Sequence, residues 1–223
     1  MREQFRIFCT IAIAVVLNLA ANARSAADVP GTAVSWRAGE QYRVLPESQA
    51  KATRPDAHQV LEFFRYDCPH CARLEPYLEQ LEAQGKREVS IQRVPIVWID
   101  RNRPYARLYY ALLAVGRPDL HAAVFATIHQ GGNRLLDDDL KGKTSELHVK
   151  FATAHGIDEK HFRAAYWSQD VTSKVERAEM LSHLYEVDAV PMVVIGGRFV
   201  SNVPMAGSPQ QLIHLISDLA RRS

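Results

Sequence analysis

An apolar segment that leads directly into a pair of cysteines constrains this chain more than any other feature. Val60 to Phe64 is apolar except at Glu62, and Cys68-Pro69-His70-Cys71 follows shortly after. Such a run predicts a strand covered on both faces of its sheet. Pro69 suits the first turn of a helix, where its missing N–H is not needed. A helix that begins at Cys68 presents unpaired N–H groups and the positive end of its dipole to this sulfur, which favours a thiolate. We therefore interpret Cys68 and Cys71 as a redox-active disulfide pair.

Other uses of a Cys-x-x-Cys pair fit the sequence less well. A zinc site needs three or four protein ligands, and the chain holds no second cysteine pair. Attachment of a c-type haem requires histidine directly after the second cysteine, where this chain has Ala72. A structural cross-link stays open, but closing so short a loop restrains the unfolded chain very little. We expect no metal site and no haem, and we favour the redox role.

A second motif, Ala189-Val190-Pro191-Met192, lies far downstream. The apolar strand, the CPHC sequence and this motif, in this order, resemble the thioredoxin superfamily and most closely the DsbA family of bacterial thiol:disulfide interchange proteins. The resemblance extends from about Gly39 to the C-terminus and implies an α/β thioredoxin fold with an inserted helical domain. Pro76 departs from the DsbA pattern, since it resembles a helix proline of thioredoxin itself.

The resemblance implies a role for the downstream motif. In the thioredoxin superfamily this proline is cis, lies against the dithiol and leaves the backbone before it free to pair with an extended substrate. We therefore expect a cis bond at Val190-Pro191 and assign both residues to substrate binding. The alternative is a trans proline that opens a strand, where its missing N–H does no harm.

Two further side chains are assigned to catalysis beside Cys68 and Cys71. His70 can carry a proton and a positive charge next to the sulfurs. Glu62 shares a strand face with Val60, so its carboxyl should be desolvated. It could pair structurally with a base such as Arg93, or it could relay the proton of Cys71 when the mixed disulfide resolves, which is our preferred interpretation. The resemblance also implies a buried acid near this point.

Two other groups of titratable residues are interpreted as structural. Glu75 is expected to be a solvated helix charge with a minor electrostatic effect. The histidines of the segment after residue 102, His121 among them, are interpreted as solvated or core residues rather than metal ligands.

The first 23 residues have the pattern of a secretory signal peptide. A basic start and an apolar stretch precede Ala21-Asn22-Ala23, which matches a small-residue cleavage site. The apolar stretch is short for a membrane span, although an uncleaved anchor remains an alternative. Cleavage would remove Cys9 and leave only Cys68 and Cys71. We therefore expect an oxidising compartment, the periplasm.

The remaining pattern predicts a sheet interrupted by helices. In chain order we expect an edge strand over Gln41–Leu45, a strand over Ala57–Arg65, a helix from Pro69 to about Gly85, a parallel strand over Val89–Val97, helices capped by Asp119 and Asp158, a helix over Val171–Val187, a hairpin turning at Gly196-Gly197 and a last helix capped by Ser208. We divide the chain into a signal peptide (1–23), a first thioredoxin-like part (28–100), an inserted helical domain (101–170) and a second thioredoxin-like part (171–223).

Together these features predict an exported thiol:disulfide oxidoreductase. It would donate the Cys68–Cys71 disulfide to reduced, unfolded client polypeptides through a mixed disulfide at Cys68. The resemblance implies that a quinone-linked membrane thiol oxidase of the DsbB type restores the disulfide. The 223 residues carry a net charge of +2, with no basic run between aromatics and no phosphate-binding glycines, so we expect neither nucleic acid nor cofactor. We also expect a monomer. The alternatives are a disulfide isomerase or reductase of the same fold and a non-catalytic periplasmic binding protein.

Overall fold

The computed structural model describes residues 35–47, 56, 58–84, 89–137 and 143–222. The predicted signal peptide, Cys9 and the helix end predicted at Gly85 lie outside these residues. The fold described below is that of the unit beginning at Trp36.

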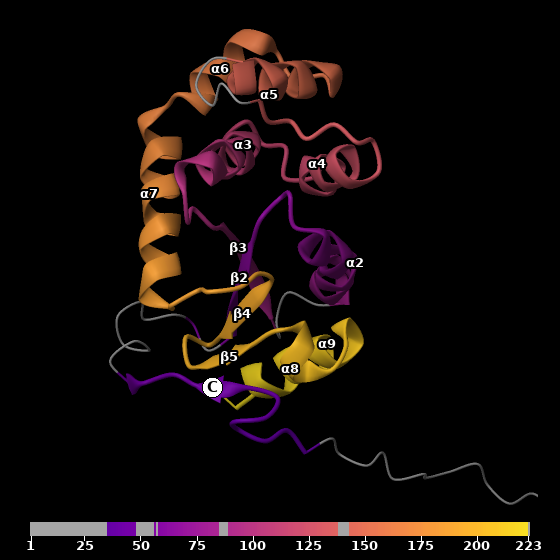
Figure 1. Cartoon of the computed structure of the whole chain (residues 1–223), viewed down its shortest axis with the longest axis vertical. Coiled ribbons are helices and arrows are strands. Elements are labelled where there is room, and N and C mark those ends of the chain that lie inside the picture. The colour runs from indigo at the N-terminus through magenta and orange to yellow at the C-terminus, as the bar shows by residue number, and fades with distance from the viewer. Residues whose placement is uncertain (1–34, 48–55, 57, 85–88, 138–142, 223) are drawn as a thin grey trace, which may run out of the picture. The chain divides into compact units, whose positions relative to one another are not determined.

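One mixed sheet forms the centre of this unit (Figure 1). Its strands stand in the order β1-β5-β4-β2-β3, with β2 parallel to β3 and all other neighbours antiparallel. The predicted parallel pair is therefore confirmed, and β2 lies in the interior of the sheet. The strands are β1 (Arg43–Val44), β2 (Gln59–Phe64), β3 (Ser90–Pro95), β4 (Met192–Ile195) and β5 (Phe199–Ser201).

Every element between β3 and β4 is helical in the described part of the chain, as predicted. We call η1 to α6 the helical insert; in Figure 1 it lies above the sheet, and α7 leads from it back to β4. The helices are α2 (Pro69–Gln84), the 3-10 turn η1 (Asp100–Asn102), α3 (Arg103–Ala114), α4 (Leu120–His129), α5 (Lys143–Ala154), α6 (Glu159–Tyr166), α7 (Gln169–Leu184), α8 (Val203–Ala206) and α9 (Pro209–Ala220).

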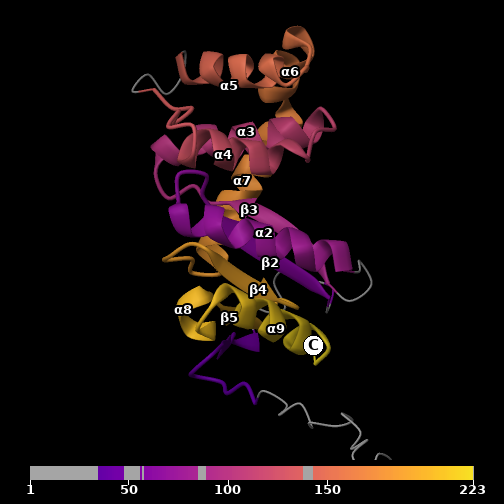
Figure 2. The ribbon, with the colours of Figure 1, turned by 90° about the vertical axis from the view of Figure 1, so that its right-hand side faces the viewer.

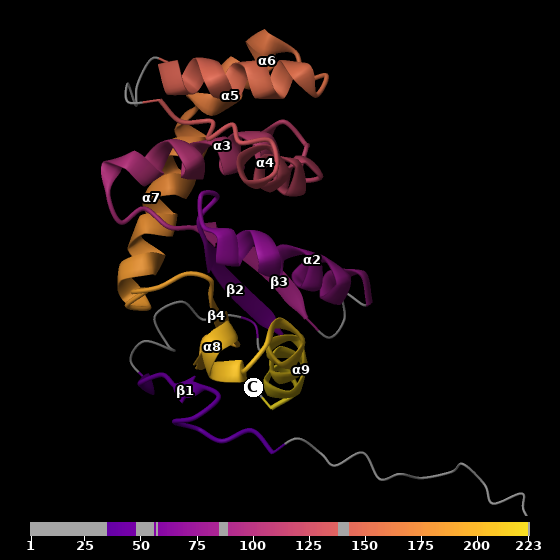
Figure 3. The ribbon, with the colours of Figure 1, turned by 45° about the vertical axis from the view of Figure 1, so that its right-hand side comes forward.

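The two faces of the sheet bury different layers of helices. On one face Val60 and Ile195 pack in a cluster with residues of α2 and α9, such as Leu78. On the other face Leu61 and Phe63 join a larger cluster with residues of α3 and α7. Figure 3 shows α2 and α9 on the side of the sheet away from α7. Alternation along β2 thus explains why the strand reads as continuously apolar.

Predicted helix starts and turns are confirmed with one exception. The side chains of Asp158 and Ser208 accept backbone N–H bonds at the starts of α6 and α9. Gly196 and Gly197 have φ of 55° and 62°, as a two-residue hairpin of the primed type requires. The predicted cap at Asp119 is wrong. Its backbone is already helical (φ −56°, ψ −25°) and no cap hydrogen bond forms; the carboxylate instead pairs with Arg117.

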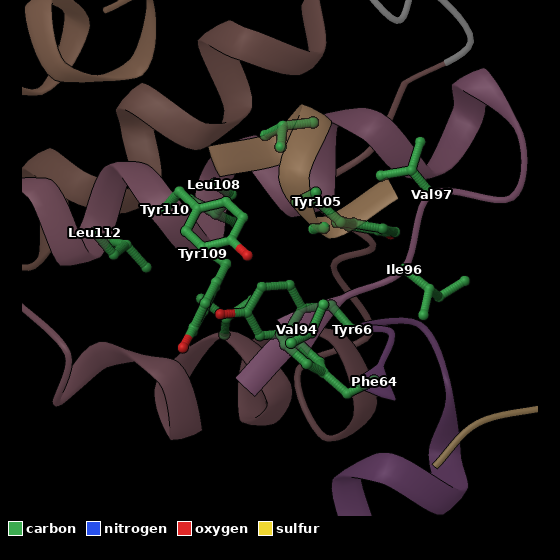
Figure 4. Packing of buried hydrophobic residues seen from close by; sticks show 14 of the residues in the cluster. Phe64, Tyr66, Val94, Ile96, Val97, Tyr105, Leu108, Tyr109, Tyr110 and Leu112 are labelled. Atoms are coloured by element: carbon green, nitrogen blue, oxygen red, sulfur yellow. The ribbon is translucent and has the colours of Figure 1, made fainter. Parts of the chain in front are cut away.

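An aromatic cluster joins the end of β2 to the helical insert (Figure 4). The Phe64 ring meets Tyr66 and Tyr109 edge to face, with centroids 5.1 and 5.3 Å apart, and Phe125 of α4 lies 5.1 Å from Tyr66. Each such pair contributes about 0.5 to 1.5 kcal/mol beyond the area that it buries. The cluster therefore fixes the insert against the segment that precedes Cys68.

Truncation of Phe64 tests this connection. Phe64 is fully buried, so Phe64→Ala should lower the free energy of unfolding by about 3 to 5 kcal/mol. Chemical denaturation of the reduced protein measures the loss. Leu113→Ala, at a partly exposed position of α3, is the control and should change stability much less. A loss below about 1 kcal/mol for Phe64→Ala would contradict the assignment.

Candidate active site

Cys68 stands directly before the first residue of α2, where the sheet delivers the chain to the helix. Its backbone N–H donates to the Arg65 carbonyl at 3.1 Å, and its own carbonyl accepts from Ala72 at 3.1 Å. Cys68 is 7% exposed and Cys71 is fully buried, and both are free thiols. Only the first sulfur is thus open to a substrate.

The two thiols have opposite acidities. The pKa of Cys68 is lowered from 9.0 to about 6, chiefly by a hydrogen bond from the Cys71 thiol. Burial opposes this shift, while the backbone N–H groups of Cys71 and His70 and the charge of His70 add to it. Burial and the neighbouring Cys68 raise the pKa of Cys71, and the charge of Glu62 adds to this. At neutral pH Cys68 is therefore a thiolate and Cys71 a protonated thiol.

His70 is exposed on the first turn of α2. Its Nδ1 lies 2.8 Å from Nη2 of Arg73, which donates to this nitrogen when the imidazole is neutral. Arg73 thus places a second positive group beside the dithiol, which the sequence interpretation missed. Its spacing of three residues from His70 on a helix was the available signal.

The downstream motif lies against Cys68. The Val190-Pro191 bond is cis, as predicted. The Cys68 sulfur lies 3.5 Å from the carbonyl oxygen of Val190, although the two residues are far apart in the sequence. The structure therefore brings Cys68, Cys71, Val190 and Pro191 together.

A pocket of about 430 Å³ borders this junction. Its wall is mostly apolar and comes from the start of α2, the approach to β4 and α8, a helix that the sequence interpretation missed. The lining residues are His70, Arg73, Ala189, Val190, Pro191, Asn202, Val203, Pro204, Gly207 and Pro209.

Glu62 is fully buried in β2, opposite Arg93 of β3 in the sheet register. Nε of Arg93 lies 3.6 Å from its carboxylate, so the structural pairing that we considered is present. Burial, followed by the charge of Glu75, raises the pKa of Glu62 well above its usual value, while Arg93 opposes the shift. Glu62 therefore holds a proton at higher pH than an ordinary glutamate, and its relay role stays a prediction.

The expectation that Glu75 is solvated is wrong. Glu75 is 3% exposed, and its carboxylate lies 2.6 Å from Nη2 of Arg93 and 3.3 Å from Nε2 of His121. Burial alone would raise the pKa of Glu75, but the hydrogen bond and charge of His121, together with Arg93, lower it. The cause of the error is α4, which packs on α2 and covers a face that the helix pattern presents as polar. His121 is a buried core histidine, one of the two interpretations given for it, and its ring also contacts the charged cluster.

The described residues also bear on two other kinds of site. No group of three or more His, Cys, Asp or Glu side chains there could hold a metal ion. Within the same residues, no helix has the length and apolar character that crossing a membrane requires.

Comparisons with known proteins agree with this geometry. The profile of the DSBA-like thioredoxin domain family matches residues 59–216. The thiol:disulfide interchange protein DsbA of Bordetella parapertussis is 34% identical over 190 residues, 85% of this chain and 87% of that protein. DsbA of Azotobacter vinelandii is 32% identical over 178 residues, 79% of each chain. The crystal structure of Pseudomonas aeruginosa DsbA aligns with a TM-score of 0.72 at 26% identity, over 84% of this chain and 94% of that one.

The chain belongs to the DSBA-like thioredoxin family. It is a thiol:disulfide oxidoreductase with the thioredoxin fold that the sequence predicts. The spacing of its motifs was sufficient to identify this DsbA-like character before the structure.

Acidity of Cys68 in this DsbA-like chain is the first property to measure. The thiolate absorbance of the reduced protein should titrate with a midpoint near pH 6, the pKa of Cys68. The thiolate stabilises the reduced fold fully above the ordinary thiol pKa of 9.0, and this contribution is lost as the pH falls through about 6. The reduced form should therefore lose stability relative to the oxidised form as the pH falls through that range. Cys68→Ser is the control, and a wild-type midpoint near 9 would contradict the assignment.

Glu62→Gln should stabilise the DsbA-like fold at neutral pH. The raised pKa of Glu62 means that the folded state binds its proton more tightly than the unfolded chain, so the wild type loses stability as the pH rises above about 4. The variant lacks this loss, and the difference should vanish below about pH 4. Unfolding by denaturant across this range measures it, with Glu79→Gln on the exposed side of α2 as control. A pH-independent difference would show that ionisation of Glu62 is not the cause.

Proposed function

We propose that this chain is an exported oxidant that transfers its Cys68–Cys71 disulfide to reduced, unfolded proteins in the periplasm. A substrate thiolate attacks Cys68, and Cys71 leaves with the electron pair of the broken disulfide and takes a proton from Glu62. The second substrate thiol then loses its proton to solvent and attacks the substrate sulfur of the mixed disulfide, so Cys68 leaves as a thiolate, and Glu62 regains a proton from solvent. The substrate loses two electrons, and the enzyme keeps them as the dithiol.

The low pKa of Cys68 is the observation that carries this proposal. A stabilised thiolate favours the reduced enzyme, so its disulfide is a stronger oxidant; this argument has already been made for DsbA itself. The protonated Cys71 leaves no second stable thiolate to compete with Cys68. An oxidase fits this asymmetry better than a reductase does.

Substrate binding is assigned to Val190, Pro191 and the adjoining pocket. The carbonyl of Val190 beside Cys68 can accept a hydrogen bond from an extended substrate backbone. The mostly apolar wall of the pocket suits apolar side chains, which unfolded polypeptides expose. Recognition through backbone and apolar contacts would accept many client sequences.

Export and regeneration complete the proposal. The pattern of residues 1–23 supports secretion, and the two cysteines left after cleavage suit an oxidising compartment. Donation of the disulfide leaves a dithiol that an external oxidant must restore. We assign this step to a quinone-linked membrane thiol oxidase of the DsbB type.

Equilibration with glutathione, followed by reaction with a reduced two-cysteine peptide, tests the function. We expect a potential well above the value of about −270 mV of thioredoxin and stoichiometric oxidation of the peptide. Cys71→Ser mixed with the oxidised peptide should form a mixed disulfide, because the Cys68 thiolate attacks the peptide disulfide and no Cys71 thiol is present to release the peptide. A potential near that of thioredoxin would make the chain a reductase, and binding without disulfide exchange would make it a binding protein.

His70→Gln should weaken the oxidant. Loss of the positive charge that helps to lower the pKa of Cys68 destabilises the thiolate. If the pKa of Cys68 rises by about one unit, the potential falls by about 30 mV. Glutathione equilibration measures the change, and His161→Gln at an exposed position of α6 is the control. An unchanged or higher potential would remove His70 from the machinery.

Pro204→Glu should slow the reaction with apolar peptides. Pro204 is exposed at the pocket wall, where a carboxylate would be desolvated by a bound apolar side chain. We expect mixed-disulfide formation with an apolar peptide to slow by about tenfold, equivalent to about 1.4 kcal/mol, while the rate with glutathione changes little. Met180→Glu, an exposed apolar position on α7, is the control. Equal slowing with both thiols would place peptide binding elsewhere.

A further inference from the structure

A buried cluster of charged and polar groups connects the helical insert to the active site. It begins at Glu62 in β2 and passes through Arg93 of β3 and Glu75 of α2 to His121 of α4. Figures 1 and 2 show α4 beside α2, and the two helices are in contact. The cluster therefore crosses from the sheet to the insert without reaching solvent at Glu62, Glu75 or His121.

Both ring nitrogens of His121 lie close to polar groups. Nε2 lies 3.3 Å from the Glu75 carboxylate, and Nδ1 lies 2.8 Å from the hydroxyl of Tyr66. Tyr66 is fully buried, and burial raises its pKa well above the usual value, so its hydroxyl keeps a proton to donate. In the neutral ring, Tyr66 as donor to Nδ1 leaves the hydrogen on Nε2, the nitrogen that faces Glu75; in the protonated ring, the charge of His121 favours the Glu75 carboxylate as well.

Two buried carboxyl groups compete for one cation in this cluster. Arg93 lies 2.6 Å from Glu75 and 3.6 Å from Glu62, and burial strongly disfavours two charged acids beside one guanidinium. One carboxyl must therefore hold a proton more tightly than the other. His121 contacts only Glu75 of the pair, so it favours the charge on Glu75 and the proton on Glu62.

We propose that His121 is a positioning residue of the active site: by holding Glu75 as a carboxylate, it keeps the proton on Glu62, within electrostatic range of Cys71. This inference rests on the oxidase function proposed above. Glu62 in its acid form can then protonate Cys71 as that thiolate leaves. The charge relations agree, since His121 acts to lower the pKa of Glu75 and the charge of Glu75 raises that of Glu62.

The other groups around His121 limit what its replacement can change. Tyr109 of α3 and Phe64 and Phe125 surround the ring at centroid distances of 5.0 to 5.3 Å. An aromatic replacement therefore keeps the packing and removes only the polar contacts. The titratable or charged groups in or next to the cluster are Glu62, Tyr66, Cys71, Glu75, Glu82, Arg93 and Tyr109.

The first test is the titration of the Glu62 carboxyl by carbon-13 NMR in the reduced full-length protein, with the signal assigned through Glu62→Gln. In His121→Phe we expect the proton affinity of Glu62 to fall by roughly tenfold, the low end of what a buried neighbouring charge does to an acid. His121→Gln keeps a donor near the position of Nε2 and should restore most of the affinity. An unchanged titration of Glu62 in His121→Phe would overturn the proposal.

His148→Phe is the matched control. His148 is also fully buried in the helical insert, and its ring contacts the Tyr166 hydroxyl at 3.1 Å and the Leu135 carbonyl at 2.8 Å. Its replacement carries a similar folding cost and should leave Glu62 unchanged. An equal shift in both variants would mean that general loosening of the insert, rather than the contact to Glu75, controls Glu62.

A double-mutant cycle keeps the test decisive if His121→Phe folds poorly. Because His121 acts through Glu75, its replacement should have no further effect on Glu62 in the Glu75→Gln background. His121→Leu and Glu75→Gln with their double variant form a second cycle, in which a smaller apolar side chain removes the same polar contacts. Additive effects on the titration would overturn the proposed connection.

The kinetic readout is the rate at which the oxidised protein forms a mixed disulfide with glutathione, corrected for the fraction of glutathione thiolate. This rate should decline as the pH rises and Glu62 loses its proton. In His121→Phe the decline should begin at lower pH, in step with the shift of the Glu62 titration. The rate near neutral pH should then be roughly tenfold lower than in the wild type. A shift in the titration without a shift in the rate would overturn the catalytic part. Failure of the wild type to oxidise a peptide would remove the proposed function but leave the Glu62 titration interpretable by itself.

Discussion

Burial of β2 on both faces is the constraint on which the rest of the structure depends. The strand lies between β3 and β4; Val60 enters one hydrophobic cluster, and Leu61, Phe63 and Phe64 enter another. Neither its register nor its direction can change without exposing one of these sets to water. The end of the strand, and with it the start of α2 at Cys68, is therefore fixed by the core rather than by the active site. A reactive sulfur can stand at a helix N-terminus because the packing behind it holds that terminus in place.

The same burial creates the electrostatic problem beneath the dithiol. An acid at Glu62 inside such a strand needs a cation, and the register places Arg93 directly opposite. Arg93 is shared, because Glu75 and Glu82 also lie within 3 Å of its guanidinium. Buried ion pairs contribute little net stability once desolvation is counted. The arrangement therefore suits the proposed role of Glu62 as a holder of one proton better than it suits a means of stabilising the fold.

The sequence was sufficient for those features that depend on local order along the chain. The strand before Cys68, the parallel β3, the Gly196-Gly197 turn and the cis bond at Pro191 follow from short motifs or from the family that they identify. Asp119 and Glu75 were misjudged for two different physical reasons. The backbone of Asp119 is already helical, so its carboxylate forms no cap and pairs with Arg117. Glu75 is covered by α4, a neighbouring helix that no local pattern encodes.

The helical insert is joined to the catalytic segment by more than apolar packing. Two histidines of α4 contact Tyr66, His121 at its hydroxyl and His129 at its backbone carbonyl, each at 2.8 Å. Tyr66 stands two residues before Cys68, so α4 holds the segment that carries the reactive sulfur. Because Glu75 also meets His121, a displacement of α4 would alter the geometry before Cys68 and the charge near Cys71 together. The insert therefore has a physical route to both sulfurs, one through the backbone and one through the buried charges.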